Sequence, residues 1–274
     1  MAQVKVHVGF DDIDSPEGGC TTHLTAKLIP KLEKEFNVKF FDYPNLIRLN
    51  PNIPWKTRGN GATALRFLVE ESRLNDLVEY VVSEVRDYIG EFSHPQSQPA
   101  VAFLVGEVSG DLRWLSRKAI QDVVLPDLAF EIAGKAGVRV FSFKGRRGVV
   151  GALAAIGEPL DMGDYTYELL AYRVRENYGE PRVVDEKSVF EMDRVFGSET
   201  FLNVDYEVSK VLITPHGPDP VLLGIRGESA EAVLKAFNIV KVGEPIERWV
   251  IFRTNQATDA HIRVVGKISE IKVY

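Results

Sequence analysis

Apolar residues recur along the chain in two spacings, which predict strands and helices in alternation. Alternating apolar positions predict a first strand over residues 3–10, and leucines four residues apart predict a helix over 21–36. The rest of the first half is predicted as strands at 38–41, 45–49, 63–69, 101–105 and 138–143, helices at 72–89 and 149–156, and a helical stretch over 112–133 interrupted by Pro126.

A turn-rich segment at residues 157–164 separates this half from a second one. The second half is predicted to hold strands over 165–175, 200–206 (or as far as 213), 220–225 and 247–254, with helices over 188–196 and 229–237. This strand-helix-strand-strand-helix-strand order is that of the split βαβ, or ferredoxin-like, fold. We therefore expect an α/β (α+β) protein with domains at 1–160 and 161–256, followed by a linker at 257–274.

Composition narrows the classes of function. A single cysteine, Cys20, excludes an internal disulfide, and with 5 histidines it leaves no paired spacing for a thiolate zinc site, so zinc is not expected. The chain has 33 basic and 39 acidic residues, a net charge of −6, and so lacks a chain-wide basic footprint for nucleic acid. With neither a signal-peptide pattern nor a run of about 18 apolar residues, we expect a cytoplasmic protein without a membrane span.

An acidic loop follows the first predicted strand. Asp11, Asp12 and Asp14 lie close together in it, and a Gly-Gly turn then leads to Thr21 and Thr22 at the start of the next helix. Clustered carboxylates suit Mg²⁺, and a helix N-terminus attracts phosphate. An ordinary polar turn with a threonine N-cap would use the same residues, so the loop alone leaves both interpretations open.

Two cationic, glycine-rich loops belong to the same half. Residues 48–62 place an indole and two cations beside a Gly-Asn-Gly turn, and residues 143–153 place cations between glycines before an apolar helix. Both loops could approach a phosphate closely, although a hairpin and a solvated basic turn also explain them. Together with the acidic loop they suit phosphoryl transfer from Mg-ATP. The candidate residues are Lys56, Arg58, Gly59, Asn60, Gly61, Lys144, Arg147 and Gly148.

Polar residues also follow strands of the second half. Asp205 ends an apolar run, Asp219 lies in a stiff proline-rich turn, and Arg226 stands between two glycines. Carboxylates in these positions could hold a cationic substrate, but ordinary hairpin chemistry accounts for them as well.

Five strings together resemble one family. They are Gly-Phe-Asp-Asp-Ile-Asp-Ser-Pro with Cys-Thr-Thr, Asn-Pro-Asn-Ile-Pro-Trp-Lys-Thr-Arg-Gly-Asn-Gly-Ala, Lys-Gly-x-x-Gly-Val-Val-Gly-Ala, Gly-Pro-Asp-Pro-Val-Leu with Gly-Ile-Arg-Gly, and Phe-Arg-Thr-Asn-Gln-x-Thr-Asp-Ala-His. Spanning residues 9–261, they follow the order found in the archaeal isoleucine-tRNA 2-agmatinylcytidine synthetases.

The resemblance implies an ATP-dependent ligase. It would conjugate agmatine to carbon 2 of the wobble cytidine in an isoleucine tRNA with a CAU anticodon. In that family ATP is split to AMP and pyrophosphate, and the γ-phosphate is placed on the 2-carbonyl oxygen before the agmatine amine displaces it. Since a carbonyl oxygen leaves poorly until it is phosphorylated, the order is chemically sensible. The implied cofactors are ATP and Mg²⁺, and the implied partners are agmatine and the tRNA.

The resemblance also implies a kinase-like first domain and residue roles. Asp11, Asp12 and Asp14 become the catalytic, metal-holding acids, and Thr21 the threonine that is autophosphorylated. A ferredoxin-like domain would help to bind agmatine, and our choice of its acid is Asp205, with Asp219 or Arg226 shaping the wall. ATP would contact Thr22, Lys56, Arg58, Gly59, Asn60, Gly61, Lys144, Arg147 and Gly148.

The chain departs from the family in several places. Ile13 replaces a usual threonine, and Ala257 replaces a usual glycine. The family continues into an OB-fold and a zinc ribbon that help to grip tRNA, whereas this chain stops about where the OB-fold would begin. We therefore expect either a shortened chain or a reduced homologue, whose missing part would hold many of the tRNA-binding cations.

Two other classes of function compete with the resemblance. One is an ATP-dependent kinase or ligase that acts on a free small molecule. The other is a catalytically idle RNA-binding fragment. Nucleotide hydrolysis would distinguish the idle fragment from both enzymes. An aromatic and cationic pocket able to take an extruded base would favour the tRNA enzyme over the small-molecule enzyme.

Overall fold

The computed structural model describes residues 2–92 and 94–262 of the chain. Its first half is built on an antiparallel sheet whose first strand is central, because residues 6–10 are buried and largely apolar. In sheet order the strands of this half are β6 (Arg139–Ser142), β5 (Ala100–Val105), β1 (Gln3–Asp11), β4 (Gly61–Glu70) and β3 (Asn45–Arg48), with β2 (Lys39–Phe40) beside β4.

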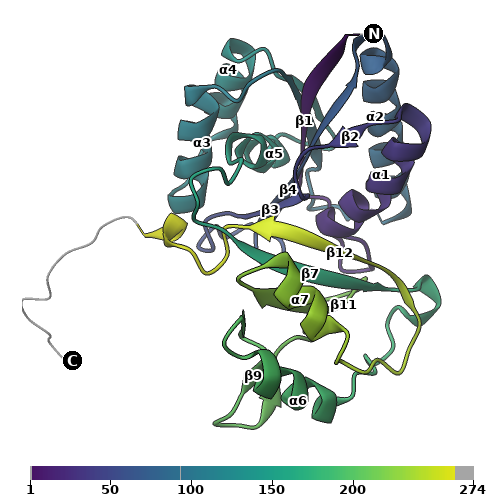
Figure 1. Cartoon of the computed structure of the whole chain (residues 1–274). Coiled ribbons are helices and arrows are strands. Elements are labelled where there is room, and N and C mark those ends of the chain that lie inside the picture. The colour runs from purple at the N-terminus through teal and green to yellow at the C-terminus, as the bar shows by residue number, and fades with distance from the viewer. Residues whose placement is uncertain (1, 93, 263–274) are drawn as a thin grey trace, which may run out of the picture.

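Helices cover both faces of this sheet (Figure 1). The face with the large side chains of β1 packs against α1 (Thr21–Phe36) and α2 (Leu74–Glu91). The other face, which carries alanines of β4 and β5, lets α5 (Gly148–Gly157) approach closely beside α3 (Gly110–Gln121) and α4 (Pro126–Lys135). The helical stretch predicted over 112–133 is therefore two helices, since Pro126 begins α4 at a position where proline is favoured.

The second half follows the predicted order of elements. These are β7 (Thr166–Arg173), α6 (Glu186–Phe196), β8 (Thr200–Phe201), β11 (Val221–Gly227), α7 (Ala230–Phe237) and β12 (Ile246–Thr254). Its four strands lie in the order β12-β7-β11-β8, all antiparallel, and both helices pack onto the core of this half.

One predicted strand of the second half is wrong. The run over 200–206 is interrupted after β8, where Leu202 takes a left-handed φ of 57°. The chain then forms β9 (Val204–Asp205), which pairs with β10 (Lys210–Val211) in a separate hairpin. This hairpin lies at the far end of the second half, around β9 in Figure 1.

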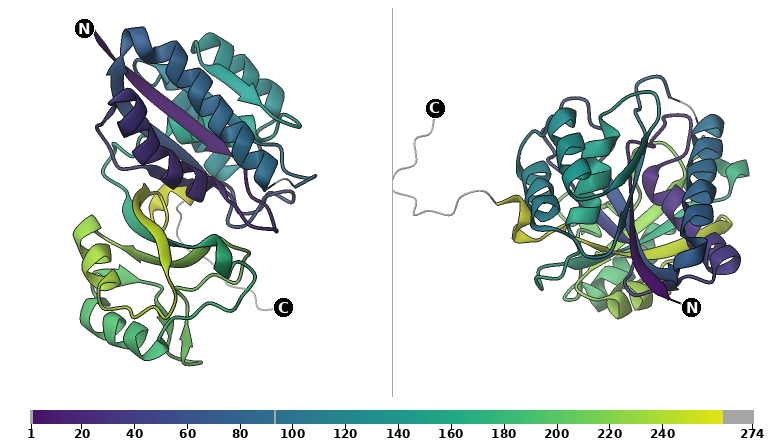
Figure 2. Two further views of the ribbon diagram at one scale, coloured as in Figure 1. Left: turned by 90° about the vertical axis from the view of Figure 1, so that its right-hand side faces the viewer. Right: turned by 90° about the horizontal axis from the view of Figure 1, so that it is seen from above.

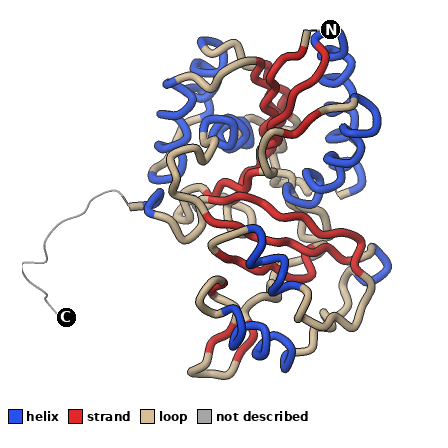
Figure 3. Tube along the Cα trace, viewed as in Figure 1, coloured by secondary structure: helices blue, strands red, loops and turns tan. Residues whose placement is uncertain are grey.

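The two halves share one continuous sheet. Arg253 and Thr254 of β12 pair in parallel with β3 of the first half, so the strands run through both halves (Figure 3). The amide side chain of Asn255 extends this ladder, because its Oδ1 accepts from the Arg48 N–H at 2.7 Å and its Nδ2 donates to the Arg48 carbonyl at 3.0 Å. Figure 2 shows the halves stacked on either side of this seam. Loops from both halves are thus held beside each other.

No helix in the described part of the chain is both long and apolar enough to cross a membrane.

Candidate active site

The acidic loop leaves the sheet where β1 ends. Asp11 is the last residue of the strand, and Asp12 takes a left-handed φ of 58°, a conformation that costs energy outside glycine. Ile13 is buried, and its N–H donates to the Thr21 hydroxyl at 3.3 Å. Asp14 accepts a 2.9 Å hydrogen bond from the Thr57 hydroxyl and pairs with Arg58 at 3.1 Å. The loop is thus tied both to the start of α1 and to the segment that precedes β4.

Burial and mutual repulsion make these carboxylates unusual. Burial, followed by the charge of Asp12, raises the pKa of Asp11 well above its ordinary value. Burial also raises the pKa of Asp12 to about 6, although the Gln98 N–H and Arg147 act against it. A carboxylate pair in this state is relieved by a cation, which makes the loop a fitting place for one.

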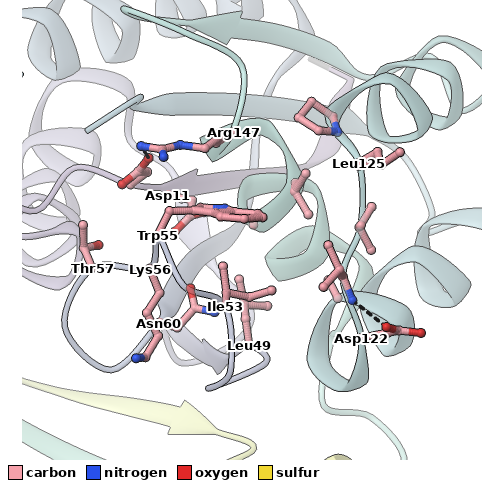
Figure 4. Close-up of a pocket in the computed structure, with 17 residues that line it drawn as sticks. Asp11, Leu49, Ile53, Trp55, Lys56, Thr57, Asn60, Asp122, Leu125 and Arg147 are labelled. Carbon is pink, nitrogen blue, oxygen red and sulfur yellow. Dashed lines mark hydrogen bonds and ion pairs between the residues drawn. The ribbon is translucent and has the colours of Figure 1, made fainter. Parts of the chain in front are cut away.

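The first pocket opens beside Asp11 and Asp12, with a cavity volume of about 100 Å³. Figure 4 shows Arg147 and Asp11 on one side and Leu125 and Asp122 on the other, with the Trp55 ring between them and Lys56 below Trp55. All its lining residues come from the first half. The apolar part of the wall is formed by Leu49, Ile53, Trp55, Ala119, Val123, Val124, Leu125, Pro126 and Val150.

This first pocket combines a flat apolar wall with opposite charges. Trp55 is half exposed, at 50%, and lies beside Lys56, while Arg147 approaches Asp12 at 3.8 Å. Gly151 lets α5 come up to the acids, since a Cβ there would lie 2.0 Å from Asp11 Oδ2. An aromatic base fits such a wall, and a polyphosphate with a divalent cation fits the charged end.

The second pocket lies on the other side of the acidic loop, at the seam between the halves. Its cavity volume is about 670 Å³, and both halves line it. From the first half come Asp14, Cys20, Thr21, Thr22, Leu46, Arg48, Thr57, Arg58 and His94, and from the second come Glu168, Leu170, Ile213, Pro218, Gly224 and Arg226, among others. Thr57 lines both pockets, so they meet at the residue that holds Asp14.

Glu168 anchors the floor of the second pocket. It projects from β7, is 1% exposed, and bridges Arg48 at 2.8 Å and Arg226 at 3.1 Å. Burial would raise the pKa of Glu168, but the two guanidinium groups outweigh it and lower the pKa. This triad ties β3 of the first half to β7 and β11 of the second.

The predicted three-acid metal site needs a correction. Among the described residues no three His, Cys, Asp or Glu side chains gather closely enough to hold a metal ion together. The reason is that Asp14 turns to Thr57 and Arg58, away from the first pocket that Asp11 and Asp12 line. Asp11 and Asp12 could hold a divalent cation at the first pocket, whereas Asp14 lines the second.

Arg58 has a different role from the one predicted. Its guanidinium donates to the carbonyls of Ser15, Gly19 and Asp219 as well as pairing with Asp14. It lines the second pocket rather than the first and joins the acidic loop to the second half. The Arg58 guanidinium therefore joins the acidic loop to the turn at Asp219 through hydrogen bonds and an ion pair.

The structure does not gather all the other predicted ATP residues in the first pocket. Lys56, Asn60 and Arg147 line it, whereas Thr22, Gly59 and Gly61 line the second. Gly59 lies close to Arg48, since a Cβ there would lie 2.9 Å from the Nη1 atom at the end of that side chain. Neither pocket is lined by Lys144 or Gly148, and the Gly148 N–H already donates to Gln98 O at 3.1 Å.

The expectation that Asp205 points to the boundary between the halves is wrong. Asp205 belongs to the β9–β10 hairpin, lines neither pocket, and accepts hydrogen bonds from the Glu207 and Val208 N–H groups of its own turn. Asp219 also lines neither pocket, because its carboxylate binds Arg173 at 3.1 Å and the Gly179 N–H at 2.7 Å. Arg226 does reach the second pocket.

Several site residues were missed by sequence reasoning. Thr57 and Arg48 lie inside a loop that was already singled out, but nothing in the sequence shows what their side chains contact. Glu168 had a usable signal, since it is the one acid in the apolar run Tyr167–Arg173, and buried acids are rare unless paired. Residues 123–126 line the first pocket, but in the sequence they are only a short apolar run, which does not indicate a binding site.

Two models of known families together match residues 7–261 of the chain. The TiaS TCKD domain model matches residues 7–145, and the TiaS FLD domain model matches residues 146–261. The chain belongs to the TiaS family. The two matches meet just before α5, which packs against β1 of the first half.

The chain is also similar in sequence and structure to individual proteins of this family. TiaS of Pyrococcus horikoshii, a 2-agmatinylcytidine synthetase for an isoleucine tRNA, is 50% identical over 269 residues, which are 98% of this chain and 62% of that protein. A complex of TiaS with its isoleucine tRNA and ATP has a TM-score of 0.85 at 42% identity, covering 94% of this chain and 60% of the other. A complex of TiaS with the tRNA, AMPCPP and agmatine has a TM-score of 0.82 at 41% identity, covering 94% and 61%. The chain thus spans about three fifths of its relatives' length.

Proposed function

We propose that this chain carries the catalytic part of an ATP-dependent ligase that joins agmatine to carbon 2 of the wobble cytidine in an isoleucine tRNA with a CAU anticodon. The observation that carries the proposal is the pair of pockets that meet at Thr57 beside the acidic loop. The first offers an aromatic wall beside charged groups, which suits the base and phosphates of a nucleotide that extends beyond its enclosed volume of about 100 Å³, and the second, at about 670 Å³, has room for further reactants. The solved relatives bound to an isoleucine tRNA, ATP, AMPCPP and agmatine support the same set of substrates.

ATP belongs in the first pocket. Its base would lie against Trp55 and the wall at 123–126, and its phosphates would face Lys56 and Arg147. Asp11 and Asp12 would hold Mg²⁺, which when bound supplies charge neutralisation on the phosphates. The first half is accordingly a kinase-like domain, with residues 1–160 as its proposed extent.

The second pocket receives the cytidine and agmatine. Its second wall comes from the strand-helix-strand-strand-helix-strand half, which we take to be a ferredoxin-like domain over residues 161–256. Each carboxylate oxygen of Glu168 accepts from one arginine, which leaves acceptor capacity for a further cation. We therefore assign agmatine to Glu168 in place of Asp205.

The residues between the pockets fit the chemistry of activation and displacement. Thr21 lines the second pocket, and its hydroxyl, fixed by Ile13, lies next to the acidic loop. We assign to Thr21 the role of receiving phosphate on the way to the cytosine 2-carbonyl oxygen. Once phosphorylated, that oxygen leaves as phosphate when the primary amine of agmatine attacks carbon 2.

Labelled agmatine tests this function directly. The chain is incubated with ATP, Mg²⁺, labelled agmatine and an isoleucine tRNA transcript, and label in the tRNA is measured. We expect label in the CAU transcript and none in a transcript whose wobble cytidine is replaced by uridine. ATP consumption without tRNA, with label in a free product, would instead show a small-molecule enzyme. No ATP consumption under any condition would leave an RNA-binding fragment.

A further inference from the structure

A relay of hydrogen bonds, buried from His23 onwards, connects the second half to the start of α1. Glu247 of β12 lies 2.7 Å from His23 Nε2, and His23 Nδ1 lies 2.8 Å from the Tyr88 hydroxyl on α2. The same hydroxyl lies 3.0 Å from the backbone nitrogen of Cys20. Three elements, β12, α1 and α2, therefore meet at one imidazole ring.

The chemistry of the partners fixes the direction of the relay. The Glu247 carboxylate can only accept, so His23 Nε2 carries the hydrogen and Nδ1 is an acceptor. Nδ1 then accepts from the Tyr88 hydroxyl at 2.8 Å, a much shorter contact than the 3.4 Å from that hydroxyl to the Cys20 carbonyl, and the Tyr88 oxygen accepts from the Cys20 N–H. Each group in the relay thus acts as a defined donor or acceptor. Removal of one group changes whether its neighbour can donate or accept.

The His23 and Tyr88 members of the relay are shielded from water, whereas Glu247 lies at the surface with a side chain that is 27% exposed. The His23 side chain is 3% exposed and Tyr88 is 5% exposed, and the ring of Tyr172 lies 5.1 Å from that of His23. Burial lowers the pKa of His23, acting with the charges of Lys27 and Arg248 and against Glu247. The imidazole is thus neutral near neutral pH, as the direction above requires.

The relay ends at the residue that precedes Thr21. Cys20 is the N-cap of α1, and its side chain makes no capping hydrogen bond. The Tyr88 hydroxyl therefore holds the backbone at this helix start from outside the helix. Thr21 and Thr22 follow at once and line the second pocket, and Thr21 in turn bonds the acidic loop through Ile13.

We propose that Tyr88 and His23 are positioning residues for Thr21, and that they make its placement depend on the seating of β12 and hence of the second half. The proposal rests on the function proposed above for its assignment of Thr21. It adds that the reactive loop is held in place only when Glu247 is present to fix the His23 tautomer. The second half then contributes to the chemistry without touching the reacting atoms.

The first experiment compares Tyr88→Phe with Tyr80→Phe. Tyr80 lies on the same helix α2, where its hydroxyl bonds Glu84, so it is a matched control outside the relay. Hydrogen exchange of the amides over residues 19–24 is measured in the whole chain. We expect exchange about tenfold faster in Tyr88→Phe, as for one lost buried hydrogen bond, and unchanged exchange in Tyr80→Phe. Equal exchange in Tyr88→Phe and wild type would overturn the proposal.

The second experiment measures ATP turnover with the isoleucine tRNA and agmatine. Tyr88→Phe should lower kcat about tenfold or more while the KM for ATP stays within about twofold, because the first pocket is untouched. Glu247→Gln keeps an acceptor for His23 Nε2 and should retain most of kcat, whereas Glu247→Leu should lose it. A KM change alone, or equal loss in both Glu247 variants, would contradict a tautomer-fixing role.

The two proposals fail in different ways. Absence of turnover in the wild-type chain under all conditions would contradict the proposed function of this chain. The relay would then be decided by the exchange of residues 19–24 alone.

Discussion

The two pockets beside the acidic loop differ in which halves of the chain line them. The first is small and half apolar, and every residue that lines it comes from the first half. The second is several times larger and is lined by both halves, with Glu168 and two arginines in its floor. In the function that we propose, nucleotide binding therefore belongs to the first half alone, whereas agmatine and cytidine meet at the seam. Variants in the two pockets should therefore have separable effects.

Glu168→Gln should give the largest effect and should act through the seam. Removing the charge leaves Arg48 and Arg226 without their buried partner, and breaking such a pair costs about 3–5 kcal/mol. The free energy of unfolding, measured by chemical denaturation, should fall by that order, and agmatine binding should be lost. Asp205→Asn is the control, and we expect both quantities to stay unchanged because Asp205 caps only its own turn. An unchanged free energy of unfolding in Glu168→Gln would contradict the role of Glu168 as the buried partner of Arg48 and Arg226.

Asp12→Ala should remove ATP turnover through the first pocket. We expect kcat to fall by about 100-fold or more, since the variant lacks one of the two acids that fit the cation. The free energy of unfolding should change by less than about 1 kcal/mol, because the lost bond from the Gln98 N–H is offset by removal of a buried charge. Turnover and denaturation of the same preparation check both parts. Wild-type turnover would remove the metal assignment.

Arg147→Ala should weaken nucleotide binding alone. Loss of a charged hydrogen bond to phosphate costs about 1.5–3 kcal/mol, so the dissociation constant of ATP should rise about tenfold or more. Agmatine affinity should stay within about twofold, and calorimetric titration of each ligand measures this. Arg146→Ala, which removes a surface pair with Asp127, is the matched control. Equal losses for both ligands would show that the pockets are not separable.

The free energy of unfolding should depend on pH through His7, a buried histidine whose hydrogen-bond partners all lie in the first half. His7 accepts from Arg66 through Nδ1 at 2.7 Å, while Nε2 donates to Gly106 O at 3.0 Å, and burial followed by the Arg66 charge lowers its pKa to about 4. The unfolded chain binds a proton near pH 6.5 and the folded chain does not, so this contribution is complete above pH 6.5 and is lost as the pH falls towards 4.

His7→Asn keeps an acceptor for Arg66 but cannot titrate. Between pH 7.5 and 5 the wild type should lose about 1–2 kcal/mol more than this variant, measured by denaturation at each pH. Parallel curves for the two proteins would contradict a neutral, buried His7.

The sequence predicted the elements better than the site. The helix over 21–36 is confirmed because a clear apolar stripe and a following Asn37 with left-handed φ define it locally. Asp11 and Asp12 were found because they end a strand. By contrast, the role of Glu168 depends on its hydrogen bonds from Arg48 and Arg226, which lie 120 and 58 residues away in the chain.

Errors arose where tertiary contacts decide what a side chain does. Arg58 carries the charge expected of a phosphate ligand, but the fold surrounds it with three carbonyl oxygens. Asp205 follows an apolar run, and only the left-handed Leu202 turns that run into a remote hairpin. Local patterns cannot anticipate either outcome.

The separation of the two pockets can be seen in a crystal structure of this chain with a non-hydrolysable ATP analogue, Mg²⁺ and agmatine. We expect the base against Trp55 and Val124, the phosphates between Arg147 and the acids Asp11 and Asp12, and agmatine across the seam beside Glu168. A nucleotide in the second pocket, or both ligands in the same pocket, would contradict this separation.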